Sequence, residues 1–103
     1  MYSYSGRILH VDLTTRRSWV NPVDEQYLKT YVGGVCLATR LLYEAIKPGA
    51  DPLGPDNALC FAASAFGGTI VPVGTKHGVA SKSPLTGFVG DSLASSYFSM
   101  AIK

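Results

Sequence analysis

The chain has 103 residues, of which 47% are hydrophobic and 16% are charged, so it holds at most one domain of ordinary size and has enough apolar residues for a packed core. Its net charge of +2 is too small for an electrostatic binder of nucleic acid, and low charge with many apolar residues excludes a disordered chain. Two cysteines cannot build a disulfide framework or a four-ligand metal site.

Neither a targeting segment nor a membrane span is predicted. The first seven residues lack the basic start and the apolar run of a signal peptide. Residues 57–75 are uncharged, but Gly67-Gly68, Pro72 and Gly74 interrupt them, which favours a buried strand and a glycine-rich loop over a transmembrane helix. We therefore expect a soluble, cytoplasmic chain without a membrane partner.

The first half of the chain is expected to form a β-hairpin and two helices. Side chains alternate over residues 8–13 with the two-residue period of a strand that buries one face, and residues 17–20 return as the second strand. A short helix over 25–31 is stopped by Gly33-Gly34. A longer helix over 35–46 has apolar residues at helical spacing, so one of its faces packs on the sheet.

The second half is expected to contribute further strands. Residues 58–65 are almost entirely apolar and predict a buried strand, which a loop at 67–75 follows. Residues 76–81 alternate again as a strand. A turn at 83–87 then precedes a short strand at 88–89.

A final helix is expected from about Leu93, with Asp91 or Ser92 as its N-cap. It has no glycine or proline stop before Lys103, which indicates a chain that ends inside its last helix, as a fragment of a larger protein would. Together these elements predict the α+β class: a β-rich domain over 1–103 with antiparallel hairpins and two to three packed helices.

The segment 67–96 is rich in glycine and small polar residues. Main-chain amides in such loops, and at helix starts, bind anions such as phosphate. Residues 91–96 combine the predicted helix start with three serines. An ordinary helix cap with a serine-rich first turn explains the same residues, and spacing alone leaves both interpretations open.

Lys76 and Lys82 share a strand face by parity, but six residues place them about 20 Å apart, so they do not hold one phosphate together. Lys76, flanked by Gly74 and Gly78, is the better anion ligand, and Lys82 is expected to be a solvated charge.

His77 is on the opposite face of the strand from Lys76, with no second histidine nearby, so we expect a hydrogen-bonded structural histidine.

Cys36 lies near the start of the longer helix and Cys60 inside the buried strand, and neither has a CxxC partner. An isolated buried cysteine is usually a small hydrophobic residue. A nucleophile at a helix start is the alternative for Cys36, although no base is identified for it. The residues alone therefore predict an α+β domain with an anion-binding loop and no defined catalytic motif.

Four segments resemble the opening of the tungsten-containing aldehyde ferredoxin oxidoreductases. Each match is modest by itself, but the four occur in the family's order and at compatible spacing, and they span nearly the whole chain. They are residues 6–15 (GRILHVDLTT), 32–34 (VGG), 51–57 (DPLGPDN) and above all 82–88 (KSPLTGF).

The resemblance implies a fold and a role. Members of the family are several times longer than this chain, and their N-terminal domain is a duplicated β-rich unit that forms a saddle under a bis-pterin tungsten or molybdenum cofactor. Later helical domains supply the cysteines of a [4Fe–4S] cluster and most of the substrate pocket. The implied parent reaction oxidises an aldehyde to a carboxylate and passes electrons through the cluster to ferredoxin. These 103 residues alone, with two cysteines, are expected to be inactive.

The resemblance also assigns site residues, none of them catalytic. Lys76 takes the place of a basic residue, usually Arg, that contacts the pterin; lysine keeps the charge but loses the bidentate fork. The Leu93 carbonyl takes the place of a ligand of the Mg²⁺ that bridges the two pterin phosphates, at a position where the family has Asn. Ser92, Ala94 and Ser95 complete the implied cofactor-binding set.

Two other interpretations stay open. One is a stand-alone module that binds pterin or assists subunit assembly without catalysis, and the other is a truncated gene product without function. The implied partners are the pterin cofactor, the downstream domains and ferredoxin. Self-association as a homo-oligomer is also expected, because the face of Leu9, Val11 and Leu13 and the apolar side of the last helix are under-covered in so short a chain.

Overall fold

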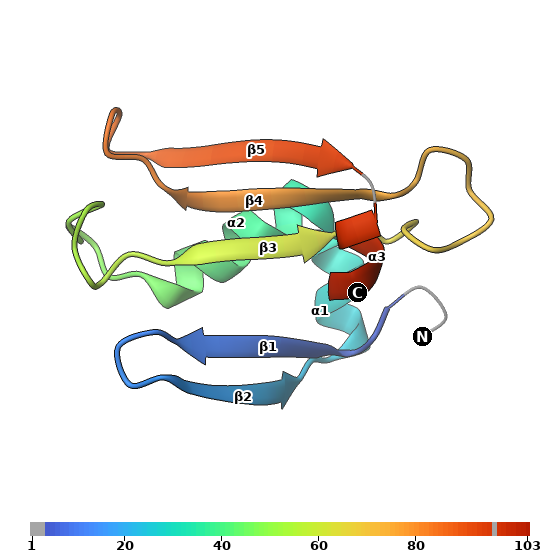
Figure 1. Cartoon of the computed structure of the whole chain (residues 1–103), viewed down its shortest axis with the longest axis horizontal. Helices are drawn as coiled ribbons and strands as arrows, with labels where there is room; N and C mark the ends of the chain where they lie inside the picture. Colours follow the sequence, from blue (N-terminus) through green and yellow to red (C-terminus); the bar gives the residue numbers. More distant parts are fainter. Residues whose placement is uncertain (1–3, 96) are drawn as a thin grey trace.

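The computed structural model describes residues 4–95 and 97–103. In chain order its elements are β1 (Arg7–Asp12), β2 (Arg17–Pro22), α1 (Glu25–Tyr31), α2 (Gly34–Ala45), β3 (Leu59–Ala63), β4 (Lys76–Lys82), β5 (Val89–Ser95) and α3 (Tyr97–Ile102). The strands form two antiparallel sheets, β1-β2 and β3-β4-β5 (Figure 1). The predicted α+β class is confirmed. None of the described helices has the length and apolar character that a membrane span requires.

The β1-β2 hairpin forms as predicted, and its second strand runs two residues further than expected. The Asp12 carboxylate accepts a hydrogen bond of 3.0 Å from the Thr14 N–H and so shapes the turn. The side chains of Leu9, Val11 and Leu13 are 64%, 57% and 84% exposed. The expectation of an under-covered apolar face is thus confirmed for this hairpin.

Helix α2 packs across β3 and β4 and lies behind the larger sheet in the view of Figure 1. The core between them is made mostly of alanine: Ala38, Leu42, Ala62 and Ala80. Such small side chains allow the helix to approach the sheet closely. The approach is tightest at Gly78, where a Cβ would lie 2.5 Å from the main-chain nitrogen of Val35.

The predicted helix from Leu93 is wrong, because its proposed cap residues Asp91 and Ser92 belong to strand β5. Helix α3 begins only at Tyr97. Strand β5 pairs with β4 along its whole length. This pairing satisfies the main-chain groups of alternate residues of β5, and it outweighs the local preference of Asp and Ser for helix caps.

Lys82 is a structural residue, and its prediction as a solvated charge is wrong. Its ammonium donates a hydrogen bond of 2.6 Å to the Ala50 carbonyl. Its own carbonyl accepts a bond of 3.1 Å from the Asn57 side-chain amide, which also donates to the Pro52 carbonyl at 2.9 Å. These bonds tie the irregular segment before β3 to the end of β4, so the charge of Lys82 is used within the fold.

Helix α3 packs on the face of the sheet opposite α2 (Figure 1). The ring of Phe98 meets Phe61 edge to face at a centroid distance of 5.9 Å, and it meets the His77 ring at 5.0 Å. The Nδ1 atom of His77 lies 2.8 Å from Ser99 Oγ, and both residues are buried. The predicted structural role of His77 is confirmed.

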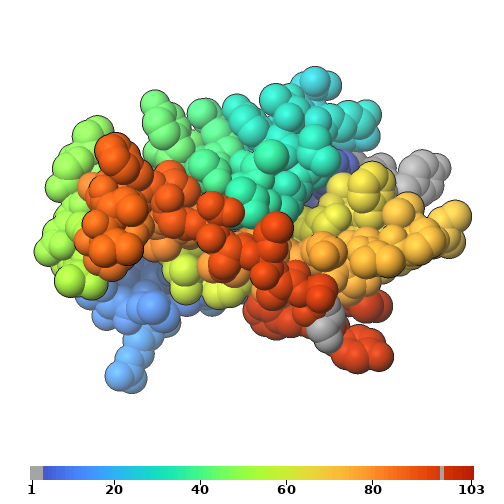
Figure 2. All heavy atoms as spheres, turned by 90° about the horizontal axis from the view of Figure 1, so that it is seen from above, coloured from blue at the N-terminus to red at the C-terminus, as the bar shows by residue number. Residues whose placement is uncertain are grey.

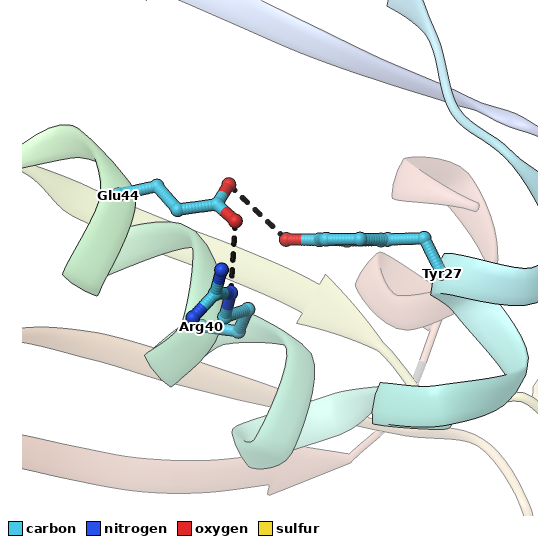
Figure 3. A network of polar contacts seen from close by, with 3 residues as sticks. All are labelled: Tyr27, Arg40 and Glu44. Atoms are coloured by element: carbon cyan, nitrogen blue, oxygen red, sulfur yellow. Dashed lines mark hydrogen bonds and ion pairs between the residues drawn. The ribbon is translucent and has the colours of Figure 1, made fainter.

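A polar network joins α1 to α2 (Figure 3). The Tyr27 hydroxyl donates to Glu44 Oε2 at 3.2 Å, and Arg40 Nε donates to Glu44 Oε1 at 2.8 Å. Burial, and then the negative charge of Glu44, raise the pKa of Tyr27, so the phenol keeps the proton that it donates. The network holds α1 against the second half of α2.

Candidate functional site

A small cleft lies where the first turn of α2 meets the end of β3 and the start of β4. Its volume is about 200 Å³, and its lining includes Gly33 and Gly34 before α2, Ser64–Phe66 after β3, and Lys76 and Leu93 from β4 and β5. Two of the predicted cofactor-binding residues are therefore brought together on neighbouring strands. The loop that follows β3 (yellow to gold) projects beyond one end of the larger sheet (Figure 1), and its atoms lie toward one end of the molecule in Figure 2.

The α2 side of the cleft is bare main chain. A Cβ on Gly33 would lie 2.9 Å from the Ala63 carbonyl oxygen and 3.1 Å from the Ala65 nitrogen, and the φ of this glycine is 152°. Only glycine meets both conditions. The N–H groups of the first turn, which begins at Gly34, have no acceptor within the helix and carry a partial positive charge. Of the first-turn residues, Gly34 lines the cleft, together with Lys76.

The predicted cofactor residues on β5 fall on two faces. Leu93 lies opposite Gly78, whose own face is covered by α2. Because side chains alternate along a strand, the odd-numbered positions of β5 share this face with Lys76. The even-numbered ones, Ser92 and Ala94, point to the other face. Their side chains therefore do not join Lys76 at the cleft.

The main chain of Leu93 is directed to the free edge of the larger sheet. The Lys76 carbonyl accepts a hydrogen bond of 2.8 Å from the Ser64 N–H, so the main chain of Lys76 bonds toward β3. In an antiparallel sheet, a residue whose main chain bonds to one neighbouring strand forms a non-hydrogen-bonded pair with its partner on the other neighbouring strand. The partner of Lys76 on β5 is Ser95. The Gly78–Leu93 pair, two residues along, is of the same kind. The Leu93 carbonyl therefore points away from β4, toward the edge of the sheet.

The anion-binding helix start predicted at 91–96 does not take that form. Residues 91–95 are strand, and Ser96 lies outside the described residues. The helix start at the cleft belongs to α2, which sequence reasoning assigned only as a packing helix after a glycine stop. The signal that points to it is Gly33-Gly34 itself, a glycine pair directly before a long helix, where main chain can approach a ligand.

In residues 4–95 and 97–103, no group of three or more His, Cys, Asp or Glu side chains is arranged to hold a metal ion. Cys60 is half-buried and packs against the core, whereas Cys36 is exposed on the first turn of α2. The prediction of Cys60 as a small hydrophobic residue is confirmed.

The two thiols are expected to differ in reactivity toward iodoacetamide by about tenfold or more, with Cys36 the faster. Burial raises the pKa of Cys60, so less of it is thiolate at neutral pH, and the reagent also reaches it less easily. Mass spectrometry of the two cysteine peptides over time measures both rates. The urea-unfolded chain is the control, and equal rates in the folded chain would contradict the prediction.

The family model for the aldehyde ferredoxin oxidoreductase N-terminal domain matches residues 8–103. Over 103 aligned residues, the chain is 39% identical to the tungsten-containing aldehyde ferredoxin oxidoreductase of Pyrococcus furiosus and 38% identical to that of Thermococcus kodakarensis. Each alignment covers the whole of this chain but 17% of the length of the relative.

Two further similarities are to oxidoreductases with other names. The chain is 33% identical over 106 aligned residues to the WOR-like subunit of an aliphatic sulfonate oxidoreductase from Pyrococcus furiosus, of which it spans 17%. Among solved structures, it is similar to the active site complex BamBC of benzoyl coenzyme A reductase, with a TM-score of 0.82 and 28% identity. That match covers 88% of this chain and 14% of the other.

Proposed function

The chain belongs to the aldehyde ferredoxin oxidoreductase family, through its N-terminal domain, and on that basis we propose that it forms the first part of the scaffold for a bis-pterin tungsten or molybdenum cofactor. The observation that carries the proposal is the cleft that Lys76, Leu93 and the bare main chain at Gly33-Gly34 line together, with the Leu93 carbonyl directed to the sheet edge beside it.

The residues at the cleft fit an anionic group that is held largely by main chain. At Gly33 a side chain would clash with the end of β3, because its Cβ would lie 2.9 Å from the Ala63 carbonyl oxygen. The first turn of α2 and the ammonium of Lys76 offer donors to phosphate or pterin oxygens. The Leu93 carbonyl is an oxygen ligand of the kind that Mg²⁺ takes. A leucine in place of the family's asparagine is compatible with this role, because the side chain takes no part.

The cofactor, when bound, supplies the oxidation–reduction chemistry. The chain binds and orients it. Lys76 neutralises negative charge at the cleft, and Ser95, its cross-strand partner, places a hydroxyl on the same face. Ser92 and Ala94 are left with main-chain roles only, because their side chains point to the other face of the sheet.

For the complete gene product, the proposed activity is oxidation of an aldehyde to a carboxylate in the cytoplasm, with electrons passing to ferredoxin. Two relatives named for aldehydes, at 39% and 38% identity, are more similar to the chain than the sulfonate enzyme, at 33%. The [4Fe–4S] cluster of this proposal belongs to downstream domains, with which the chain would be associated. Four thiolates are needed for such a cluster, and this chain has two cysteines.

Replacing Lys76 by Ala in the complete gene product is expected to lower its affinity for the cofactor about ten- to a hundredfold, because a charge-assisted hydrogen bond is lost. Lys76→Arg should recover or improve binding, since the guanidinium adds a second donor in fixed geometry. The measurement is tungsten and pterin content per chain, for variants purified identically.

Lys47→Ala is the matched control, because Lys47 is an exposed lysine just beyond the far end of α2. It should keep the cofactor content of the unmodified protein. Equal occupancy in Lys76→Ala and the unmodified protein would remove Lys76 from the site and leave only the main-chain donors.

A further inference from the structure

We propose that Lys103 is a positioning residue for the cleft: its ammonium fixes the main chain that follows β3 and so sets the shape of one cleft wall. This inference rests on the proposed function, because the consequence of that shape is the binding of the cofactor. The wall is the stretch Ser64–Gly67, of which Ser64, Ala65 and Phe66 line the cleft.

The contact consists of two hydrogen bonds from one charged group. The Lys103 Nζ atom donates to the Ala65 carbonyl at 2.9 Å and to the Gly67 carbonyl at 2.6 Å. Burial lowers the pKa of Lys103, as expected for an ammonium that is partly withdrawn from water. Because the ammonium has three donors and two of them point to carbonyls of the wall, its geometry fits a clamp better than a direct cofactor ligand.

The wall's own hydrogen bonds are mostly local. Within it, the Phe66 N–H donates to Ser64 Oγ at 3.2 Å, and the Gly67 N–H donates to the Ser64 carbonyl at 3.1 Å. These bonds shape a turn without fixing it relative to the sheet. At its beginning the wall is tied to β4 by the bond from the Ser64 N–H to Lys76. The Lys103 bonds reach across 38 and 36 residues and tie the far end of the same turn.

Lys103 directly follows helix α3, which is packed on the sheet. Ser99, which lies about one helical turn before Lys103, is fully buried and bonded to His77. The neighbouring Phe98 packs edge to face on Phe61 of β3. Helix α3 is thus fastened to the sheet on the face opposite α2, and through Lys103 it also fastens the wall. Contacts on one face of the sheet thereby control the cleft on the other.

The test compares Lys103→Met, Lys103→Arg and the control Lys47→Met in the complete gene product. Hydrogen exchange of the amides of residues 65–75 reports on the wall and its loop, and tungsten and pterin content reports on the site. Lys103→Met is expected to speed exchange in this segment about tenfold, to leave β3 protected and to lower cofactor content. Lys103→Arg should restore most of both properties, and Lys47→Met should change neither.

Unchanged exchange in Lys103→Met would overturn the proposal at its first step. Faster exchange with undiminished cofactor content would overturn it at the second, because the wall would then be irrelevant to binding. If Lys103→Met also speeds hydrogen exchange of the β3 amides, the same comparison is made with Lys103→Gln, whose side-chain amide keeps a hydrogen-bond donor. A protein without cofactor before any substitution would contradict the proposed function instead, and the exchange data would still decide whether Lys103 holds the wall.

Discussion

Replacing Gly78 by Ala is expected to destabilise the fold by about 3 kcal/mol, at the upper end of what overpacking of a core costs. The new Cβ would lie 2.5 Å from the Val35 nitrogen, 2.7 Å from Val35 Cγ2 and 2.9 Å from the Gly34 carbonyl carbon. Two of these atoms belong to the main chain and cannot rotate away. Helix α2 would have to move off β4, which would loosen the alanine core and displace the α2 side of the cleft.

Urea unfolding followed by circular dichroism measures the loss. Gly90→Ala is the matched control in the neighbouring strand, because its Cβ would meet Ser83 Cβ at 3.4 Å and the Ser81 carbonyl oxygen at 3.7 Å. These are ordinary contacts, so a change within about 0.5 kcal/mol is expected there. Similar losses in the two variants would show that the approach of α2 to Gly78 is not what limits the side chain at that position.

Leu42→Ala is expected to cost about 2–5 kcal/mol of unfolding free energy. Leu42 is 1% exposed and is the one large side chain among the buried residues of the main core cluster. Its buried neighbours are alanines, which cannot extend into the space that it leaves, so the cavity would stay largely unfilled.

The same urea measurement applies to Leu42→Ala, with Leu85→Ala as its control. Leu85 lies in the turn before β5 and is 93% exposed, so its truncation should change the unfolding free energy by less than about 0.5 kcal/mol. A loss below about 1 kcal/mol in Leu42→Ala would mean that the helix and the sheet collapse onto the vacated space.

Elements with a strong local pattern could be predicted from the sequence. The period of two in β1 and the stops around α1 act within a few residues, and both elements form where they were expected. Strand β5 could not be predicted in this way, because Asp91 and Ser92 favour a helix cap locally. What decides their conformation is register with β4, a long-range interaction that a pattern of single residues does not contain.

The candidate site was predictable only in part, for a related reason. The resemblance places Lys76 and Leu93 at the site, and the structure brings both to one cleft. The separation of Ser92 from that cleft depends on strand parity, which becomes visible only once β5 is known to be a strand. The bonds of Lys103 join residues that are far apart in the sequence, and a lysine near the end of an apolar helix carries no local signal of such a contact.

The β1-β2 hairpin gives the molecule two cooperative units of unequal stability. Its strands pair with each other, and in the part of the chain that the structure describes they make only isolated contacts with other elements. A two-stranded hairpin is marginally stable in water, so it opens at a lower free energy than the sheet that α2 covers. A denaturant titration should therefore report a subglobal opening, in which Trp19 fluorescence changes before the helical signal is lost.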